Sequence, residues 1–481
     1  MKKNKSPFAV IDIGSSSVRL VIFDSVSHSA NTIFNEKVVL NLGKIICTNR
    51  SFSKEMIEEL IIVLKRFFEI SKNIKKKNII VFGSAAVRTA KNKQILVNLI
   101  LKKFGIRLKV LSEKEEGLLA AKGLFFSRNI VNGLVGDFGG GSLELVKVKK
   151  RDQSEFLGSS NLGHVVLQGL GQPDGVIISN FIDRNLKKIE SKNFKNFYAI
   201  GGSFRALAKV HMHIESDEIK IIQDYSVNAE NFIHSIRKVI FKEGTINENF
   251  LKKISKSRCQ IIPYALVILE KIVKKFKIKN IYFTNTEIRE GILYKNISEK
   301  ESDPFLSQVK KISNSLKTRD VKRIFDWVKS FDGNIKLCDR IVKAACWLMN
   351  IGANIHPEHR RVFALEEILY YPFNHLERKD RYLLSLILYF RYSNSIKDKF
   401  VTTYINKVSP RELESCKVLG QLLRIVHHLT GRLNYKVLKL CKISMTKKNK
   451  VSLKINKDPH LVFSQSLNRG VENISNIYKN N

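Results

Sequence analysis

The stretches VIDIGSSSVRLV, at residues 10–21, and VGDFGGGSLELV, at residues 135–146, follow one pattern. Each runs from an apolar segment through an aspartate and a turn of small residues into a second apolar segment. At a constant offset of 125 positions (137 − 12) they agree at Asp12/Asp137, Gly14/Gly139, Ser17/Ser142, Leu20/Leu145 and Val21/Val146. Glycine and serine suit tight turns between strands, so the sequence predicts the same β-hairpin twice.

The residue types of each hairpin suit a metal-bound phosphate. Backbone N–H groups in a turn of small residues can approach phosphate oxygens, and a carboxylate at a strand end can hold a divalent cation. Two such hairpins facing each other across a cleft would clamp opposite sides of a phosphoryl group. The alternative of two ordinary tight turns is disfavoured by the paired acids. The candidate phosphate-binding residues are Gly14, Ser15, Ser16, Ser17, Gly139, Gly140, Gly141 and Ser142.

Strand-like and helix-like segments alternate through the first 300 residues, as is typical of an α/β fold. Segments rich in Val and Ile predict strands at 8–13, 18–24, 78–82, 107–111, 132–137, 143–149, 154–160, 196–200 and 279–284. Apolar residues at helical spacing predict helices at 53–71, 92–104, 113–126, 174–190, 202–210, 259–277 and 287–297. Together with the repeated hairpin, this order predicts two lobes, over residues 1–125 and 126–300.

From about residue 304 onward, strand signals give way to helical periodicity. The helical segments are 304–330, 338–352, 360–371, 379–392 and 410–430. The polar stretch NISEKESDP, at residues 296–304, ends in proline and is the expected linker. The sequence therefore predicts a separate, all-helical C-terminal domain over residues 304–481.

Composition narrows the class of protein and of partner. With 481 residues and 44% hydrophobic content, the chain can build two to four globular domains. Its 84 Lys and Arg against 44 Asp and Glu give a net charge of +40, which favours a polyanionic partner. Lysine is spread along the whole chain, so a general compositional bias explains the same excess equally well.

Cysteine spacing and hydropathy indicate a soluble cytoplasmic protein. The six cysteines are scattered without a C-x-x-C pair, which argues against zinc and structural disulfides. The longest apolar stretch, YLLSLILYF at residues 382–390, is shorter than the roughly 20 residues that a membrane-spanning helix needs.

Several motifs resemble one family, the exopolyphosphatases and guanosine pentaphosphate phosphohydrolases of the actin, Hsp70 and sugar-kinase superfamily. The resemblance covers about residues 7–295 and implies two duplicated actin-like, or ribonuclease H-like, lobes around a cleft. The motifs are AVIDIGSSSVRLVIFD (9–24), GSAAVRTAKN (83–92), LSEKEEGLLAAKGL (111–124), VGDFGGGSLELV (135–146), AIGGSFRALA (199–208) and REGILY (289–294).

The resemblance implies roles for particular residues. Glu116 falls on the catalytic glutamate that activates the attacking water, whereas the neighbouring Glu113 and Glu115 are interpreted as helix N-terminal acids. Arg88 matches an arginine that reaches phosphate, with a surface arginine at a helix start as the alternative. The residues implied to hold Mg²⁺ are Asp12, Asp137 and Glu144.

A third turn, IGGSFRAL at residues 200–207, leads from a strand into a helix. Gly201, Gly202 and Ser203 there can present N–H groups and the positive helix end to phosphate. Close packing of helix on strand is the alternative interpretation of these small residues.

Two positions depart from the family pattern. Ser16 stands where the family commonly has asparagine, and Glu287 stands where it usually has glycine. Neither change removes the implied metal ligands or Glu116.

Family members can carry a C-terminal segment that resembles the HD metal phosphohydrolases. Here Met349 and Asn350 stand where the His-Asp metal pair would be, so we expect no second metal site. His356 and His359 flank Pro357, which disfavours a regular helix, and we expect them to be structural or solvated. The helical domain is expected to form a dimer interface and a basic channel for a long anionic chain.

The leading hypothesis is an exopolyphosphatase that uses Mg²⁺ to release terminal orthophosphate from inorganic polyphosphate. The near alternative is hydrolysis of guanosine pentaphosphate (pppGpp) at the same site. Remoter alternatives are an actin-like or kinase-like ATPase and a non-enzymatic RNA binder. The chain lacks a recognisable nucleic-acid-reading motif, so we expect no specific nucleic-acid partner and no membrane partner. The family implies a homodimer.

Overall fold

The computed structural model describes residues 6–129, 131–150, 152–217, 219–242, 245–298, 301–313, 316–446, 450–456 and 464–479. The chain divides into two compact units, Met1–Glu301 and Ser302–Asn481. The division falls within residues 296–304, the linker expected from the sequence.

The first unit contains two sheets, and the first sheet has the order β3-β2-β1-β4-β5. Its strands are β1 (Phe8–Ile13), β2 (Ser17–Phe23), β3 (Thr32–Val39), β4 (Ile79–Gly83) and β5 (Leu108–Val110). The central strand β1 runs antiparallel to β2 and parallel to β4. The helices of this lobe are α1 (Leu42–Asn49), α2 (Lys54–Ile70), α3 (Ala85–Thr89) and α4 (Lys93–Phe104).

The second sheet has the order β10-β13-β9-β6-β7-β8. Its strands are β6 (Asn132–Phe138), β7 (Leu143–Lys149), β8 (Ser154–Ser160), β9 (Asn196–Ile200), β10 (Tyr225–Asn228) and β13 (Asn280–Phe283). The helices of this lobe are α6 (His164–Gln168), α7 (Val176–Lys187), α8 (Gly202–Ile214), α9 (Ala229–Ile240), α10 (Glu248–Ile254) and α11 (Ile262–Phe276). The two-residue strands β11 (Phe241–Lys242) and β12 (Thr245–Ile246) follow α9.

The duplication extends from the hairpins to the whole sheets. Strands β1 to β5 of the first sheet correspond in order and direction to β6, β7, β8, β9 and β13 of the second. This confirms the prediction of two duplicated lobes. Strands β3 and β10 and helices α9 and α10 were not predicted from the sequence.

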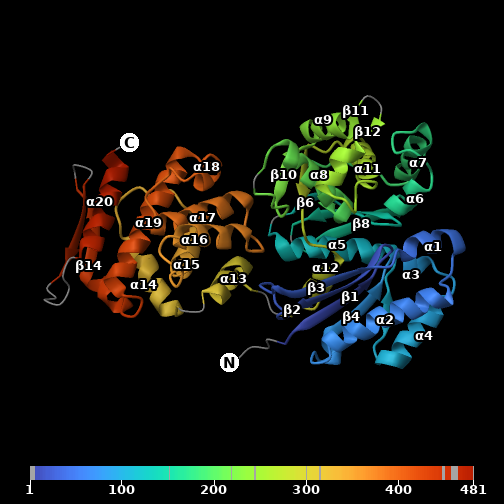
Figure 1. Cartoon of the computed structure of the whole chain (residues 1–481), viewed down its shortest axis with the longest axis horizontal. Coiled ribbons are helices and arrows are strands. Elements are labelled where there is room, and N and C mark those ends of the chain that lie inside the picture. The colour runs from blue at the N-terminus through green and yellow to red at the C-terminus, as the bar shows by residue number, and fades with distance from the viewer. Residues whose placement is uncertain are drawn as a thin grey trace. The chain divides into compact units, whose positions relative to one another are not determined.

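Helices α5 (Glu113–Ser127) and α12 (Ile288–Lys295) pack against each other between the two sheets (Figure 1). Two glycines allow this close approach. A Cβ at Gly291 would lie 1.8 Å from the Leu119 carbonyl oxygen, and one at Gly123 would lie 2.2 Å from that of Glu287. Because α5 follows β5 and α12 follows β13, the two helices begin after equivalent strands of the two sheets.

The C-terminal unit is mainly helical, but it is not all-helical as expected. Its helices are α13 (Pro304–Ile312), α14 (Thr318–Lys329), α15 (Asp339–Leu348), α16 (Arg360–Tyr370), α17 (Arg378–Tyr392), α18 (Lys399–Ile405), α19 (Pro410–Thr430) and α20 (Gln465–Lys479). Strands β14 (Cys441–Met445) and β15 (Val451–Ile455) form an antiparallel hairpin. The strand pattern was missed because each strand alternates apolar and polar residues over only five positions in Lys-rich sequence.

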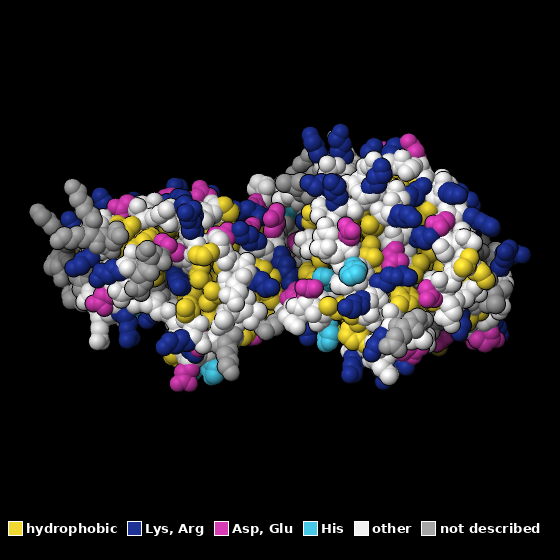
Figure 2. Space-filling view, turned by 90° about the horizontal axis from the view of Figure 1, so that it is seen from above, with side chains coloured by type: hydrophobic (Ala, Val, Ile, Leu, Met, Phe, Trp, Pro, Cys, Tyr) yellow, Lys and Arg dark blue, Asp and Glu magenta, His cyan; other side chains and the backbone are white. Residues whose placement is uncertain are grey.

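On the face shown in Figure 2, Lys and Arg side chains are scattered among apolar and acidic ones rather than gathered in a single patch. Among the described residues, no helix combines the length and apolar character that crossing a bilayer requires. Cys259, Cys338, Cys346, Cys416 and Cys441 form no disulfide, and the side chain of Cys47 lies outside the described residues.

Candidate active site

A polar cavity with a volume of about 160 Å³ lies where the repeated hairpins of the two lobes meet. Most of the residues that the sequence singled out line it, and they come from both lobes. These are Asp12, Gly14, Ser15, Ser16, Ser17, Glu116, Asp137, Gly139, Gly140, Gly141, Ser142, Gly201, Gly202 and Ser203. The other two, Arg88 and Glu144, lie directly behind the lining and contact residues of the site.

The two hairpin turns have the same hydrogen-bond geometry. The Gly14 N–H donates to the Ser17 carbonyl oxygen at 3.0 Å, and the Gly139 N–H donates to the Ser142 carbonyl oxygen at 3.0 Å. The turns also contact each other across the cleft, since a Cβ at Gly140 would lie 2.9 Å from the Cβ of Ser15. The repeated sequence thus builds one turn twice and brings both copies to one cavity.

Asp137 and Glu144 form a buried acidic pair on the second hairpin. They face each other across the β6–β7 ladder, and their exposed fractions are only 8% and 1%. Burial, followed by the nearby Glu116 charge, raises the pKa of Asp137 to about 8 and raises that of Glu144 well above its usual value. The Ser159 hydroxyl donates to Glu144 at 3.2 Å.

Glu116 lies in the first turn of α5 and is 7% exposed. Arg88, on α3, donates to the Glu116 Oε2 at 2.7 Å and to the Leu111 carbonyl oxygen at 2.9 Å, which fixes its guanidinium. Burial raises the pKa of Glu116, and the Arg88 charge opposes that effect. A buried carboxylate with a raised pKa and a fixed orientation suits a general base.

The neighbouring acid Glu115 has a structural role at the start of this helix. It forms a capping box with Ser112, whose N–H donates to the Glu115 carboxylate at 3.0 Å. It also pairs with Lys109, and Glu113 is exposed. Of the three glutamates in this first turn, Glu116 alone lines the cleft cavity.

The turn from β9 into α8 closes the far side of the cavity. Gly201 has φ of 105°, and a Cβ there would lie 2.7 Å from the Phe138 carbonyl oxygen. A Cβ at Gly202 would lie 2.3 Å from the Arg258 guanidinium, so this glycine lets Arg258 lie against the turn. The glycines thus permit close packing, and the turn also lines the cavity, while its binding of phosphate stays a prediction.

Sequence reasoning missed several charged residues that line the cavity, which are Arg19, Lys37, His164, Arg205, Arg258, Glu287 and Arg289. Arg19, Arg205 and Arg289 lie inside the family motifs, and a basic side chain within a phosphate-binding motif is the signal that could have identified them. Lys37 on β3 and Arg258 before α11 belong to no recognised motif.

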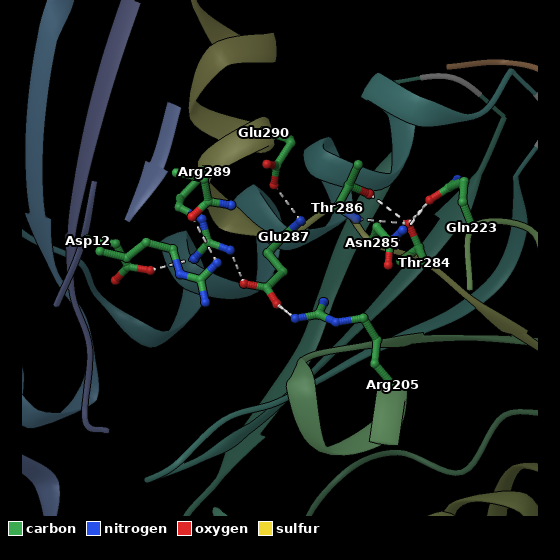
Figure 3. Close-up of polar contacts among 11 residues, drawn as sticks. Asp12, Arg205, Gln223, Thr284, Asn285, Thr286, Glu287, Arg289 and Glu290 are labelled. Carbon is green, nitrogen blue, oxygen red and sulfur yellow. Dashed lines mark hydrogen bonds and ion pairs between the residues drawn. The ribbon is translucent and has the colours of Figure 1, made fainter. Parts of the chain in front are cut away.

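A chain of ion pairs links the two lobes at this cavity (Figure 3). Arg289 donates to the Asp12 Oδ2 at 2.8 Å and also pairs with Glu287, which in turn pairs with Arg205. Burial would raise the pKa of Glu287, but Arg205 and Arg289 outweigh it and lower that pKa below its usual value. Glu287 is therefore a partly buried, ionised carboxylate.

The loop between β13 and α12 holds Glu287 in place. Gln223 accepts hydrogen bonds from the Thr284 hydroxyl at 3.1 Å and from the Asn285 N–H at 3.0 Å (Figure 3). The Glu287 N–H donates to the Glu290 carboxylate at 2.7 Å, which caps α12. The side chain of Glu287 thus leaves a fixed backbone and lies between two arginines.

The donor set of the cleft fits a hard divalent cation. Asp137 has no Lys or Arg within salt-bridge distance among the described residues, although it lies beside Glu116 and Glu144. Within the same part of the chain, Asp12, Asp137 and Glu144 do not converge as a tight three-ligand cage. That spacing suits Mg²⁺, which usually keeps several waters and takes one or two carboxylates together with substrate phosphate.

In the C-terminal unit, Met349 is fully buried. His356, Glu358 and His359 are exposed, and their ligand atoms lie within 4.8 Å of one another. Among the described residues this is the only such group of three potential metal ligands. Its full exposure suits the solvated role expected for the two histidines.

Two α/β lobes of equivalent topology, each contributing a hairpin turn to a cavity beside a buried glutamate, define an actin-like fold. The chain belongs to the Ppx/GppA phosphatase family, whose sequence model matches residues 20–300. The model of the exopolyphosphatase C-terminal region matches residues 335–471.

Solved structures of the family share the fold. An exopolyphosphatase from Cytophaga hutchinsonii superimposes with a TM-score of 0.54 at 23% identity, over 61% of this chain and 98% of that one. A Ppx/GppA family member from Aquifex aeolicus gives a TM-score of 0.52 at 21% identity, over 61% and 97% of the two chains.

Among curated relatives, a bifunctional 3-dehydroquinate synthase/phosphatase of Fusobacterium nucleatum is 24% identical over 322 residues, which are 62% of this chain and 48% of the relative. A guanosine-5'-triphosphate,3'-diphosphate pyrophosphatase of Vibrio campbellii is 24% identical over 332 residues, 64% of this chain and 63% of the relative. The chain thus spans about half to five-eighths of these relatives' lengths.

Proposed function

We propose that the protein is an exopolyphosphatase that depends on Mg²⁺ and releases terminal orthophosphate from inorganic polyphosphate. The observation that carries this proposal is the convergence of two identical hairpin turns, with Asp12 and Asp137, on one polar cavity beside the buried Glu116. This arrangement supports the proposal because it would accommodate a phosphoryl group between two sets of backbone N–H groups, with Glu116 as the proposed base.

In the proposed reaction, the two turns and the β9–α8 turn hold the terminal phosphoryl group. Glu116, oriented by Arg88, accepts a proton from the attacking water while the oxygen of that water forms a bond to phosphorus. The bond from that phosphorus to the bridging oxygen breaks, and the shortened chain leaves with the electron pair. Asp137 and Glu144 would hold Mg²⁺, and Asp12, one oxygen of which is engaged by Arg289, would contribute less; the ion would neutralise charge on the phosphate oxygens.

The lining of the cavity favours a phosphate chain over a nucleotide. Five cationic side chains line it, whereas Phe138 and His164, its aromatic lining residues, are themselves buried. A cavity of about 160 Å³ with this lining suits linked phosphates better than a stacked base.

The test is orthophosphate release by the purified chain, with and without Mg²⁺, from long-chain polyphosphate and from guanosine pentaphosphate at matched terminal-phosphate concentrations. We expect release from polyphosphate that requires Mg²⁺, with the higher kcat/KM for that substrate. Absence of orthophosphate release from polyphosphate would overturn the proposal.

Hydrolysis of guanosine pentaphosphate is the second candidate. It is favoured by the curated relatives that carry the name guanosine-5'-triphosphate,3'-diphosphate pyrophosphatase. A higher kcat/KM for guanosine pentaphosphate in the same assay would select it. Assembly as a homodimer stays a prediction, which light scattering of the purified chain would test.

A further inference from the structure

The cleft cavity is lined by five cationic side chains that fall into two groups. Arg205 and Arg289 are paired with Glu287. Arg19, Lys37 and Arg258 have no carboxylate within salt-bridge distance among the described residues, although Arg19 donates to Asn35 at 3.1 Å. The cavity therefore contains two arginines that share the Glu287 carboxylate and three cations without acidic partners in the described part of the chain.

Glu287 holds its two arginines at a fixed place. Its two carboxylate oxygens contact different guanidinium groups, one from α8 and one from α12. Each arginine still has a buried nitrogen without a hydrogen-bond partner among the described residues, Nη1 of Arg205 and Nε of Arg289. The Glu287 carboxylate thus lies between two guanidinium groups. These groups could equally well balance the charge of a phosphate in the same place.

The second group of cations is arranged for an external anion. Burial, followed by repulsion from neighbouring arginines, lowers the pKa of Arg19 and of Arg258. For Lys37 the order is the same, and burial and then the Arg258 charge lower its pKa. Like charges brought together at the edge of a cavity are relieved when a polyanion binds.

We propose that Glu287 is a specificity-determining residue of the cleft, because its carboxylate offsets one of the two positive charges of Arg205 and Arg289 and so limits the negative charge that a substrate can place there. The leaving part of the substrate is then held by Arg19, Lys37 and Arg258. This inference rests on the proposed function in that a phosphate-chain substrate enters the cavity.

One consequence is that the negative charge of Glu287 should favour dissociation of the shortened product. Replacing Glu287 with a neutral residue leaves Arg205 without its carboxylate, leaves Arg289 with Asp12 alone, and removes a negative charge that repels the substrate. The chain should then bind phosphate chains more tightly, and the shortened product should dissociate more slowly. The acid therefore trades affinity for turnover.

The test uses the full chain in the Glu116→Gln background, where hydrolysis of the probe is expected to be about 10²- to 10⁴-fold slower, and measures the Kd of tripolyphosphate with Mg²⁺ by calorimetry. Glu287→Gln should tighten binding about tenfold, the order expected for one like charge at about 10 Å and an effective dielectric constant of about 20. Glu287→Gly should act in the same direction, since glycine is accepted at a helix N-cap and offers a second neutral variant if glutamine prevents folding.

Two variants serve as controls. Glu287→Asp keeps the charge, so its Kd should stay within about twofold of the parent. Glu270→Gln removes a carboxylate that pairs with Arg237 outside the cavity, and it should also leave the Kd unchanged. The inference is overturned if neither neutral variant at position 287 tightens binding, or if Glu270→Gln tightens it equally.

Failure of this inference and failure of the proposed function are distinguishable. If Glu287→Gln tightens tripolyphosphate binding but the wild-type chain releases no orthophosphate, the function is wrong and the charge-limiting role stands. If wild type hydrolyses polyphosphate and the neutral variants bind no more tightly, the function stands and the role of Glu287 is wrong.

Discussion

The hairpins β1–β2 and β6–β7 share one backbone turn, but they place opposite charges beside their aspartates. Across the ladder, Asp12 faces Arg19, whereas Asp137 faces Glu144. Asp12 also accepts a hydrogen bond from Arg289 at 2.8 Å. Burial raises the pKa of both aspartates, and Arg289 opposes the effect at Asp12, while the Glu116 charge adds to it at Asp137.

The comparison shows what duplication kept and what it changed. Both copies keep the turn whose N–H groups suit phosphate oxygens. Asp12 of the first copy is paired with a cation of the protein itself, whereas Asp137 and Glu144 of the second have no Lys or Arg within salt-bridge distance among the described residues. The two hairpins thus share one backbone turn but differ in the charges that surround their acids.

The largest expected effect concerns Glu116, which lies beside the acidic hairpin. Glu116→Gln should lower orthophosphate release about 10²- to 10⁴-fold, the usual contribution of a general base. Glu113→Gln, an exposed position on the same helix turn, should retain activity within about twofold. Initial rates on polyphosphate measure both. Equal losses in the two variants would place the base elsewhere.

Arg289 tests the compensated side of the comparison. Arg289→Met should lower the free energy of unfolding by about 3–5 kcal/mol, because it leaves Asp12 and Glu287 buried without that cation. Arg237→Met breaks a pair in which the arginine is 48% exposed and should cost less than about 1 kcal/mol. Denaturant unfolding measures both values, and similar losses would contradict the buried chain of ion pairs.

A smaller effect is expected from His164, which lines the cavity and contacts the second hairpin turn. Its backbone N–H donates to the Gly139 carbonyl oxygen, and burial, followed by the Arg258 charge, lowers the pKa of His164 to about 4. In the unfolded chain His164 has a pKa of about 6.5, so it takes up a proton more readily there than in the folded protein. This histidine therefore leaves the folded protein most stable above about pH 6.5 and makes it less stable as the pH falls toward 4.

His164→Gln should remove this part of the acid sensitivity. The free energy of unfolding of the variant minus that of wild type should increase by up to about 3 kcal/mol as the pH falls from about 7.5 to about 4. This follows from roughly 1.4 kcal/mol for each unit by which the pKa is lowered. Denaturant titrations at several pH values measure the difference. A difference that does not change with pH would show that His164 titrates normally.

Local sequence was enough to predict the hairpins, because an Asp-x-Gly-x-x-Ser pattern between apolar runs determines a tight turn within a few residues. It was not enough for β3, because its sequence TIFNEKVV does not alternate apolar and polar residues. This edge strand also leaves Ile33 and Val39 exposed. Lys37, which lines the cavity from that strand, was missed for the same reason.

The ion-pair chain was missed for a different reason. Asp12 and Arg289 are separated by 277 positions, and only the packing of α12 between the sheets brings them together. The departure at Glu287 was visible in the sequence, but its meaning depends on Arg205 of a different helix. The acidic residues of the site could be predicted from the sequence. Which arginines pair with them could be identified only from the tertiary structure.

Binding of Mn²⁺, as a paramagnetic substitute for Mg²⁺, is the most direct test of the asymmetry between the hairpins. In an EPR titration of wild type, Asp137→Asn and Asp12→Asn, we expect Asp137→Asn to weaken Mn²⁺ binding at least about tenfold. Asp12→Asn should weaken it less than about threefold, because Arg289 already engages one of its oxygens. Equal weakening in both variants, or wild-type affinity in Asp137→Asn, would contradict the account.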